Sequence, residues 1–336
     1  MRNLVYIGNK LDSKGKTEST IDTLSKHLSN EGYTVFTASS KKNKVLRLFE
    51  MLYTITKHAH KSPYILIDTY STSNFYYALV CSQLCRIFKL KYIPILHGGN
   101  LPNRLKYNPK LSKTIFKNAY KNVSPSLYLM SHFEAFGYKN LIHIPNTIQL
   151  EKYHFKPRTF ETIKLLWVRS FSEIYNPLLA IDVLKILKDN NLDASLCMVG
   201  PEKDGSLKKT KQYADSLNLK VEFTGKLSKD AWIKLSEDYN MFINTTNFDN
   251  MPVSVIEAMA LGLPVMSTNV GGIPYLIDNE KDGFLVNKND AMAFVEAIKK
   301  VVNNVEFTQK ITSNARNKAE DFNWSNVKNL WVSMLQ

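Results

Sequence analysis

The sequence predicts an α/β protein with two doubly wound domains in tandem. Apolar strand-like runs alternate with amphipathic helical stretches in the first half, which is the pattern of parallel strands joined by helices. After an irregular charged stretch from 145 to 162, the alternation starts again. A length of 336 residues also fits two domains of this kind. We therefore expect one domain over 1–150, a second over 151–322, and a final helical segment over 323–336.

In the first half, the expected elements follow one another closely. Strands are expected at 4–7, 34–37, 64–68, 92–96, 122–124 and 141–144. Helices are expected at 17–31, 44–60, 74–90 and 109–121, with another starting at Pro125. Ligands of open α/β sheets bind at the carboxyl ends of the strands, so the loops that follow these strands are the candidate binding segments.

In the second half, the same order recurs. Strands are expected at 164–168, 195–199, 221–224, 241–243, 265–267 and 284–286. Helices between them include 177–190 and 229–237, and two more follow Asp290. The last helix carries one apolar stripe, formed by Trp324, Val327, Leu330, Trp331 and Met334. A stripe of this kind must be covered, and the first domain is one candidate surface for it.

The net charge of +14 is distributed unevenly. Residues 1–150 hold 21 basic and 7 acidic side chains, whereas the remainder is balanced. This predicts a polyanionic partner for the first domain: an anionic membrane surface or a phosphorylated acceptor. Nucleic acid is not expected because no nucleic-acid-binding motif is present. The basic run 104–121 interleaves lysines with apolar residues, so it is either an interfacial segment on lipid or a solvated helix with its apolar side in the core.

Cysteine usage and the N-terminal sequence together predict a cytoplasmic protein. No stretch approaches the roughly 18 apolar residues of a membrane span. The chain enters a strand-like run at Leu4 without a signal-peptide pattern. Cys81, Cys85 and Cys197 are expected to be small buried hydrophobic residues, because no cluster of metal ligands accompanies them. The basic first half adds a second expectation: the protein could also bind peripherally to the inner face of the cell membrane.

The stretch 247–265 carries the strongest functional signal. Asn250 is a suitable N-cap and Pro252 a suitable first residue for a short helix that ends near Gly262. Glu257 is the one formal charge on this apolar helix, and a buried carboxylate is costly unless something binds it. Asp249 stands beside the helix N-terminus, which attracts anions. These features suit a ligand that is part phosphate and part sugar.

Asp249 and Glu257 are followed by Gly262-Leu-Pro-Val265 and by Gly271-Gly-Ile-Pro274. This combination resembles the donor-site signature of the retaining GT-B glycosyltransferases of family 4. The resemblance implies the GT-B fold, in which two Rossmann-like domains face each other across a cleft. It also implies transfer of a sugar from a nucleotide diphosphate sugar to a glycan or lipid-linked acceptor, with retention of configuration and without a required metal. Cell-surface polysaccharide synthesis is the implied process.

The resemblance also implies roles for individual residues. Glu257 would bind the ribose of the donor, Asp249 the transferred sugar, and Arg169 the diphosphate, while His97 would face the sugar from the first domain. The remaining implied donor-binding residues are the helix start, with Asn250, Met251, Pro252 and Val253, and the nucleotide pocket, with Gly200, Gly225 and Lys226. From the residues alone, Gly15 lies in a loop of small residues that leads into a helix, although Gly15-Lys16-Thr17 lacks the first glycine of a P-loop.

Three positions depart from the family pattern. Asp249 is one methylene shorter than the usual glutamate, and Tyr275 stands where the Gly-Gly-x-Pro segment usually continues with glutamate. The family's lysine is absent from Ile174-Tyr-Asn176, so half of the expected cationic clamp is missing unless Lys203 or Lys226 substitutes. Two other functions therefore stay open: a nucleotide-sugar epimerase of the same fold, and a catalytically inactive sugar-nucleotide-binding protein.

Structural roles also stay open for five of these positions. Glu257 could be a solvated glutamate of the helix. Asp249 could serve as a turn or cap residue. Arg169 could form a surface salt bridge, and His97 could be a histidine of the core or a loop. The two adjacent glycines at Gly271 could form a simple tight turn.

Overall fold

The computed structural model describes residues 2–10 and 19–336. The chain divides into two compact units. Unit 1 contains the residues up to Pro145 together with Val327–Gln336, and unit 2 is Asn146–Asn326. The loop containing Gly15 lies outside the described residues.

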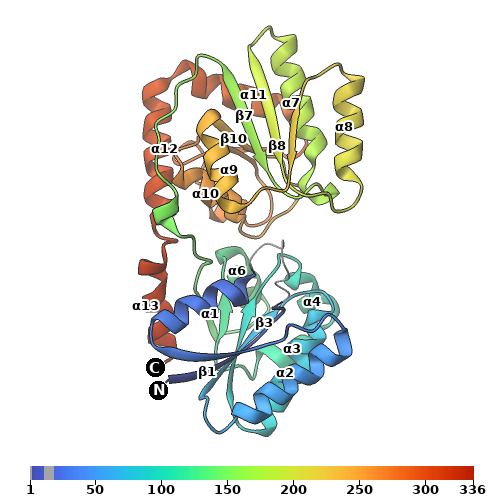
Figure 1. The fold of residues 1–336 in the computed structure, drawn as a ribbon, viewed down its shortest axis with the longest axis vertical. Coiled ribbons are helices and arrows are strands. Elements are labelled where there is room, and N and C mark those ends of the chain that lie inside the picture. The colour runs from blue at the N-terminus through green and yellow to red at the C-terminus, as the bar shows by residue number, and fades with distance from the viewer. Residues whose placement is uncertain (1, 11–18) are drawn as a thin grey trace. The chain divides into compact units, whose positions relative to one another are not determined.

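Unit 1 is a parallel sheet covered by helices (Figure 1). Its strands, in the order β2-β1-β3-β4-β5-β6, are β1 (Arg2–Ile7), β2 (Tyr33–Ala38), β3 (Tyr64–Thr69), β4 (Lys91–Leu96), β5 (Asn122–Ser124) and β6 (Leu141–His143). Every residue of β3 is buried, as expected for an inner strand with both faces covered. The helices are α1 (Thr20–Asn30), α2 (Lys44–His58), α3 (Asn74–Ile87), α4 (Leu101–Tyr107), α5 (Pro109–Phe116) and α6 (Leu127–Ala135).

The basic run 104–121 has its apolar side in the core of unit 1. Leu105, Ile115 and Phe116 are almost completely buried. They join the apolar cluster that also contains residues of α3 and α6. Of the two alternatives for this run, the solvated helix with a core-facing apolar side is the one that the structure supports.

Unit 2 repeats the arrangement, with the strand order β12-β11-β10-β7-β8-β9 and parallel pairing. Its strands are β7 (Ile163–Val168), β8 (Ala194–Val199), β9 (Glu222–Gly225), β10 (Met241–Asn244), β11 (Val265–Thr268) and β12 (Phe284–Val286). Its helices are α7 (Pro177–Asp189), α8 (Ser206–Ser216), α9 (Lys229–Leu235), α10 (Val253–Ala260), α11 (Ala291–Asn303) and α12 (Val305–Glu320).

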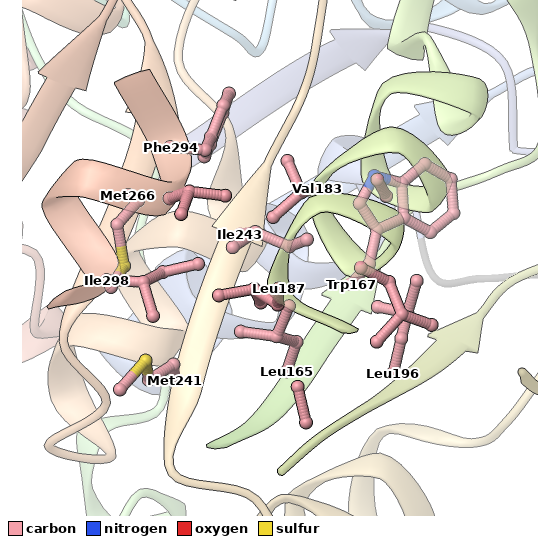
Figure 2. Close-up of a cluster of buried hydrophobic side chains, with 14 of the residues drawn as sticks. Leu165, Trp167, Val183, Leu187, Leu196, Met241, Ile243, Met266, Phe294 and Ile298 are labelled. Atoms are coloured by element: carbon pink, nitrogen blue, oxygen red, sulfur yellow. The ribbon is translucent and has the colours of Figure 1, made fainter. Parts of the chain in front are cut away.

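Two apolar clusters hold this second sheet between its helices. Figure 2 shows one of them, in which Trp167 of β7 and Ile243 of β10 meet Val183 of α7 and Phe294 of α11. The other cluster contains the apolar residues of α10. Because helices cover both faces of the sheet, ligands can reach it at the ends of its strands. The carboxyl ends of the strands carry the residues described below.

The last helix, α13 (Trp324–Met334), crosses the division between the units. From Val327 onward it belongs to unit 1, where Val327, Trp331 and Met334 are buried. Leu330, which we expected on the same buried side, is 41% exposed. The Nζ of Lys328 lies 3.7 Å from the Oε1 of Glu31 at the end of α1.

Candidate functional site

Glu257 lies on α10 and is only 3% exposed, as its apolar neighbours predicted. The helix starts at Val253, with Pro252 as its N-cap, which corrects the expectation that Asn250 is the N-cap and Pro252 the first helical residue. All helix residues from Val255 to Ala260 are buried. A carboxylate at this depth needs partners, since an unpaired buried charge is strongly destabilising.

Two residues that the sequence analysis missed supply those partners. The hydroxyl of Tyr153 donates a hydrogen bond of 2.7 Å to the Oε1 of Glu257, and the Nζ of Lys229 forms an ion pair with the same oxygen. Burial and the neighbouring Glu257 raise the pKa of Tyr153, so its hydroxyl stays a donor. Both contacts are made to the Oε1 of Glu257.

Arg169 follows β7 directly, at the carboxyl edge of the sheet. Its backbone N–H donates to the carbonyl oxygen of Val199 in the neighbouring strand (3.0 Å). Gly200 makes this packing feasible, because a Cβ at Gly200 would stand 1.7 Å from the carbonyl oxygen of Arg169. Gly200 in turn donates to the carbonyl oxygen of Gly225 at the end of β9 (2.9 Å). The glycines thus fix the backbone from which Arg169 projects.

The guanidinium of Arg169 forms an ion pair with the Oδ2 of Asp249, and both side chains are 15% exposed. It also lies over the ring of Tyr175, with 4.6 Å from Cζ to the ring centroid. Tyr175 stands in the stretch where the family's lysine is absent, so an aromatic face supports the arginine there. Burial lowers the pKa of Arg169, while Tyr175 and Glu257 raise it. The structure therefore brings Arg169, Asp249 and Glu257 into one region.

The loop that carries Asp249 packs against the adjacent glycines Gly271 and Gly272. Gly272 donates to the carbonyl oxygen of Asp249 (2.8 Å). Gly271 has φ +55°, and a Cβ there would lie 2.2 Å from that same oxygen. The carboxylate of Asp249 also accepts from the backbone N–H of Asn250 (2.7 Å). One of the N–H groups expected to hold a diphosphate therefore already binds Asp249.

Several buried polar atoms in this region have no hydrogen-bond partner within the described part of the chain. They include the Nε of Arg169, the hydroxyl of Ser254 in the first turn of α10, and the amide oxygen of Asn247. Buried polar atoms are nearly always paired in folded proteins, so a group of unpaired ones around a helix N-terminus indicates a polar ligand site. Met251, Pro252 and Val253 form the entry to that helix.

The other residues expected at the donor site occupy different positions. Gly225 ends β9 with φ +71°, and Lys226 follows it. Lys203 is exposed in the turn before α8. Tyr275, in place of the family's glutamate, is 49% exposed.

His97 belongs to unit 1, where it follows β4, and is 6% exposed. Its Nε2 lies 2.8 Å from the Oδ1 of Asp68, which also accepts from the hydroxyl of Tyr6 (2.8 Å). Burial and Asp68 raise the pKa of Tyr6 well above its usual range, so Tyr6 remains a donor. The ring of Tyr70 stacks on the imidazole with a centroid distance of 4.8 Å. The histidine is thus fixed in orientation by side chains of its own unit.

Across residues 2–10 and 19–336, no group of three or more histidine, cysteine or acidic side chains could hold a metal ion. No helix within the same residues has the length and apolarity needed to cross a membrane.

Comparison with known proteins defines the class of this chain. The family model described as glycosyl transferases group 1 matches residues 151–318, half of the chain. The region that it matches contains Arg169, Asp249 and Glu257. It also contains the glycines described above, Gly200, Gly225, Gly271 and Gly272. The chain belongs to this glycosyltransferase family.

Individual relatives agree with this assignment. The chain is 28% identical over 214 residues to the UDP-Gal:alpha-D-GlcNAc-diphosphoundecaprenol alpha-1,3-galactosyltransferase of Escherichia coli. That match covers 57% of this chain and 54% of the relative, about half the length of each. Among solved structures, sucrose-phosphate synthase from Thermosynechococcus elongatus superposes with a TM-score of 0.83 at 16% identity, covering 99% of this chain and 98% of that one.

HepE from Anabaena, in complex with UDP and glucose, superposes with a TM-score of 0.76 at 17% identity, covering 100% of this chain and 99% of HepE. At such low identity these two structures show the fold alone. With two parallel sheets flanked by helices, the fold is GT-B.

Proposed function

We propose that this chain transfers a sugar from a nucleotide diphosphate sugar to a glycan or lipid-linked acceptor, with retention of configuration, in cell-surface polysaccharide synthesis. One observation carries the proposal. Arg169, the start of α10 and two carboxylates lie in one region, and buried polar atoms there have no partner among residues 2–10 and 19–336. A diphosphate supplies the acceptors for Arg169 and Ser254, and sugar hydroxyls supply the donors for Asp249 and Glu257.

Donor binding in this proposal exchanges partners within the Arg169–Asp249 pair. The diphosphate takes the guanidinium, whose planar fork suits two phosphate oxygens. Asp249 is then released to accept hydroxyls of the transferred sugar. Glu257 accepts a ribose hydroxyl through its second oxygen, while Tyr153 and Lys229 keep its first oxygen in place.

The proposed chemistry is a same-face displacement at the anomeric carbon. The acceptor hydroxyl oxygen forms a bond to that carbon while the bond to the diphosphate oxygen breaks. The acceptor's proton passes to the leaving diphosphate, and the negative charge of this group is stabilised by Arg169 and the N-terminus of α10. These two features supply positive charge at the leaving group, so the proposal requires no dedicated metal.

The two units have different roles in this proposal. Unit 2 is the donor domain, since it contains Arg169, Glu257 and the residues that contact them. Unit 1 is the acceptor-side domain, which carries His97 as its candidate catalytic residue and has a strongly basic composition. The galactosyltransferase of Escherichia coli is named for a diphosphoundecaprenol-linked sugar, which supports a lipid-linked acceptor and a peripheral position at the inner face of the cytoplasmic membrane.

The test is product analysis of nucleotide sugars incubated with the purified chain, first alone and then with acceptor lipids extracted from cells. We expect nucleoside diphosphate release that depends on the acceptor, and a product with the donor's anomeric configuration. Conversion of the donor to its epimer without acceptor would instead establish the epimerase alternative. Donor binding without release under every acceptor condition would establish an inactive binding protein.

A further inference from the structure

The outer face of α2 in unit 1 is apolar although it faces solvent. Four of its side chains are 58–65% exposed: Val45, Leu46, Phe49 and Tyr53. We call these four residues the α2 face. The opposite side of the same helix, with Met51 and Ile55, packs into the core of unit 1. The helix is therefore already anchored, and the α2 face is a second apolar surface that folding of this unit leaves uncovered.

Lysines border the α2 face at both ends. Lys41, Lys42 and Lys44 are exposed at the start of the helix, and Lys57 lies at its end with its Nζ 5.6 Å from the ring centroid of Tyr53. The one acidic residue on the helix, Glu50, is engaged by the hydroxyl of Ser39. The surface is thus apolar in the centre and cationic at the border.

The lysine-bearing turn is held in position by the fold. The buried side chain of Arg47 donates to the carbonyl oxygens of Lys41 (2.8 Å) and Lys42 (3.1 Å). The side chain of Asn43 caps the helix by accepting from the N–H groups of Val45 and Leu46. The cationic border and the apolar centre therefore keep a fixed spacing, and little ordering is needed when a partner binds.

We propose that the α2 face docks unit 1 on an anionic lipid surface, with Leu46, Phe49 and Tyr53 entering the interfacial region and the flanking lysines binding acidic headgroups. An interfacial helix has this composition, with bulky apolar side chains on one side and lysines at its margins. A second copy of the chain would place lysine clusters against each other, which disfavours a homodimer here. The inference rests on the proposed lipid-linked acceptor, because docking would bring the enzyme to that acceptor.

The test measures co-sedimentation of the full chain with phosphatidylcholine vesicles that contain or lack phosphatidylglycerol. Binding is expected only with phosphatidylglycerol. It should weaken when NaCl is raised from about 0.1 M to about 1 M, since the Debye length falls from about 10 Å to about 3 Å. Binding that ignores lipid charge, or no binding at all, would overturn the proposal; an acidic protein would then be the better candidate partner.

Two pairs of variants locate the surface. Leu46→Ser with Phe49→Ser should lower vesicle partitioning by about tenfold or more, because two large apolar side chains no longer leave water. The matched control is Met292→Ser with Val305→Ser, which removes two side chains of similar exposure (52% and 49%) from unit 2 and should leave partitioning unchanged. Equal losses in both double variants would contradict the assignment to α2.

Charge reversal separates the α2 face from the basic run 104–121. Lys42→Glu with Lys44→Glu should lower partitioning by about tenfold or more, since each lysine contributes near an anionic surface. Lys110→Glu with Lys113→Glu should have the smaller effect, and the reverse order would move the docking surface to that run. Donor turnover in solution is measured on the same samples. In the unmodified chain, donor turnover without vesicle binding overturns the docking surface alone, and vesicle binding without donor turnover overturns only the transferase.

Discussion

The carboxyl edges of the two sheets carry polar clusters of opposite character. In unit 1, Asp68 accepts from both Tyr6 and His97, and the cluster is satisfied by its own side chains. In unit 2, Arg169 and Asp249 pair with each other, yet the Nε of Arg169 stays buried without a partner in the described residues. The first cluster is complete without a ligand, whereas the second is not.

This difference assigns different tasks to the two edges. A cluster whose polar groups are all hydrogen-bonded fixes a side chain in one orientation before the substrate binds. Its contribution is to position that side chain. A cluster with unpaired buried polar atoms gains most from a ligand that supplies the missing partners. Changes in unit 2 should therefore alter donor binding and turnover together, and changes around Asp68 should alter turnover with little effect on donor binding.

The largest effect is expected for Arg169→Gln. If Arg169 stabilises the leaving diphosphate as proposed, its removal should lower turnover by about 10²–10³, the usual loss when one group that stabilises transition-state charge is removed. The turnover of Arg169→Lys should lie between those of Arg169→Gln and the unmodified chain, because lysine keeps the charge but not the planar fork. Steady-state nucleoside diphosphate release measures both, with the exposed Lys188→Gln as control. Near-normal turnover in Arg169→Gln would remove this residue from the reaction.

Glu257→Gln should produce the next largest effect. The amide keeps the shape of the side chain, but it loses the charge that pairs with Lys229 and accepts the ribose hydroxyl, so donor affinity should fall by about 10- to 100-fold. Calorimetric titration with the donor nucleotide measures the change. Glu296→Gln, on an exposed surface of α11, provides the matched control. Equal affinities in the two variants would exclude Glu257 from the donor site.

Asp68→Asn tests the complete cluster of unit 1. Weaker orientation of His97 should lower kcat by about tenfold, equivalent to about 1.4 kcal/mol in the barrier, with the donor KM unchanged. Tyr6→Phe, which removes the other hydrogen bond to Asp68, should change kcat in the same direction but less. A raised donor KM with unchanged kcat would mean that this edge binds the donor instead of positioning a group for the reaction.

The smallest effect is expected for Tyr153→Phe. This variant removes one hydrogen bond to Glu257, while Lys229 still contacts the same oxygen, so donor Kd should rise by only about three- to tenfold. Tyr239→Phe is a close control, because the Tyr239 hydroxyl also donates to a glutamate, Glu222, at 2.7 Å. If both variants bind the donor like the unmodified chain, Tyr153 does not position Glu257 for the ligand.

Much of the fold could be predicted from sequence, because apolar runs and helical spacing are local properties. The burial of Glu257 was also predictable, since nearly every neighbour on its helix is apolar. Tyr153 was missed because it lies in an irregular stretch that carries no periodic signal, and its contact with Glu257 spans 104 positions in sequence. The pairing of Arg169 with Asp249 was also missed, since each was expected to bind the donor and nothing local indicates that they bind each other.

Surface features show the same limit. The helical spacing of 44–60 predicted a helix, but not that Phe49 and Tyr53 face outward while Met51 faces the core. The apolar residues of 104–121 could equally have faced a lipid surface or the protein core. Only tertiary packing buries Ile115 and Phe116 in the core. Which apolar residues are covered depends on neighbouring elements that are distant in sequence.

The most direct test of the account is a thermal unfolding series with nucleosides, nucleoside monophosphates and nucleoside diphosphates. Ligand that binds the native state raises Tm, and the increase grows with ligand concentration. We expect one nucleoside diphosphate to raise Tm clearly more than its monophosphate and nucleoside, and this additional increase to disappear in Arg169→Gln. If no diphosphate raises Tm, or if Arg169→Gln responds like the unmodified chain, the open cluster of unit 2 is not a donor diphosphate site.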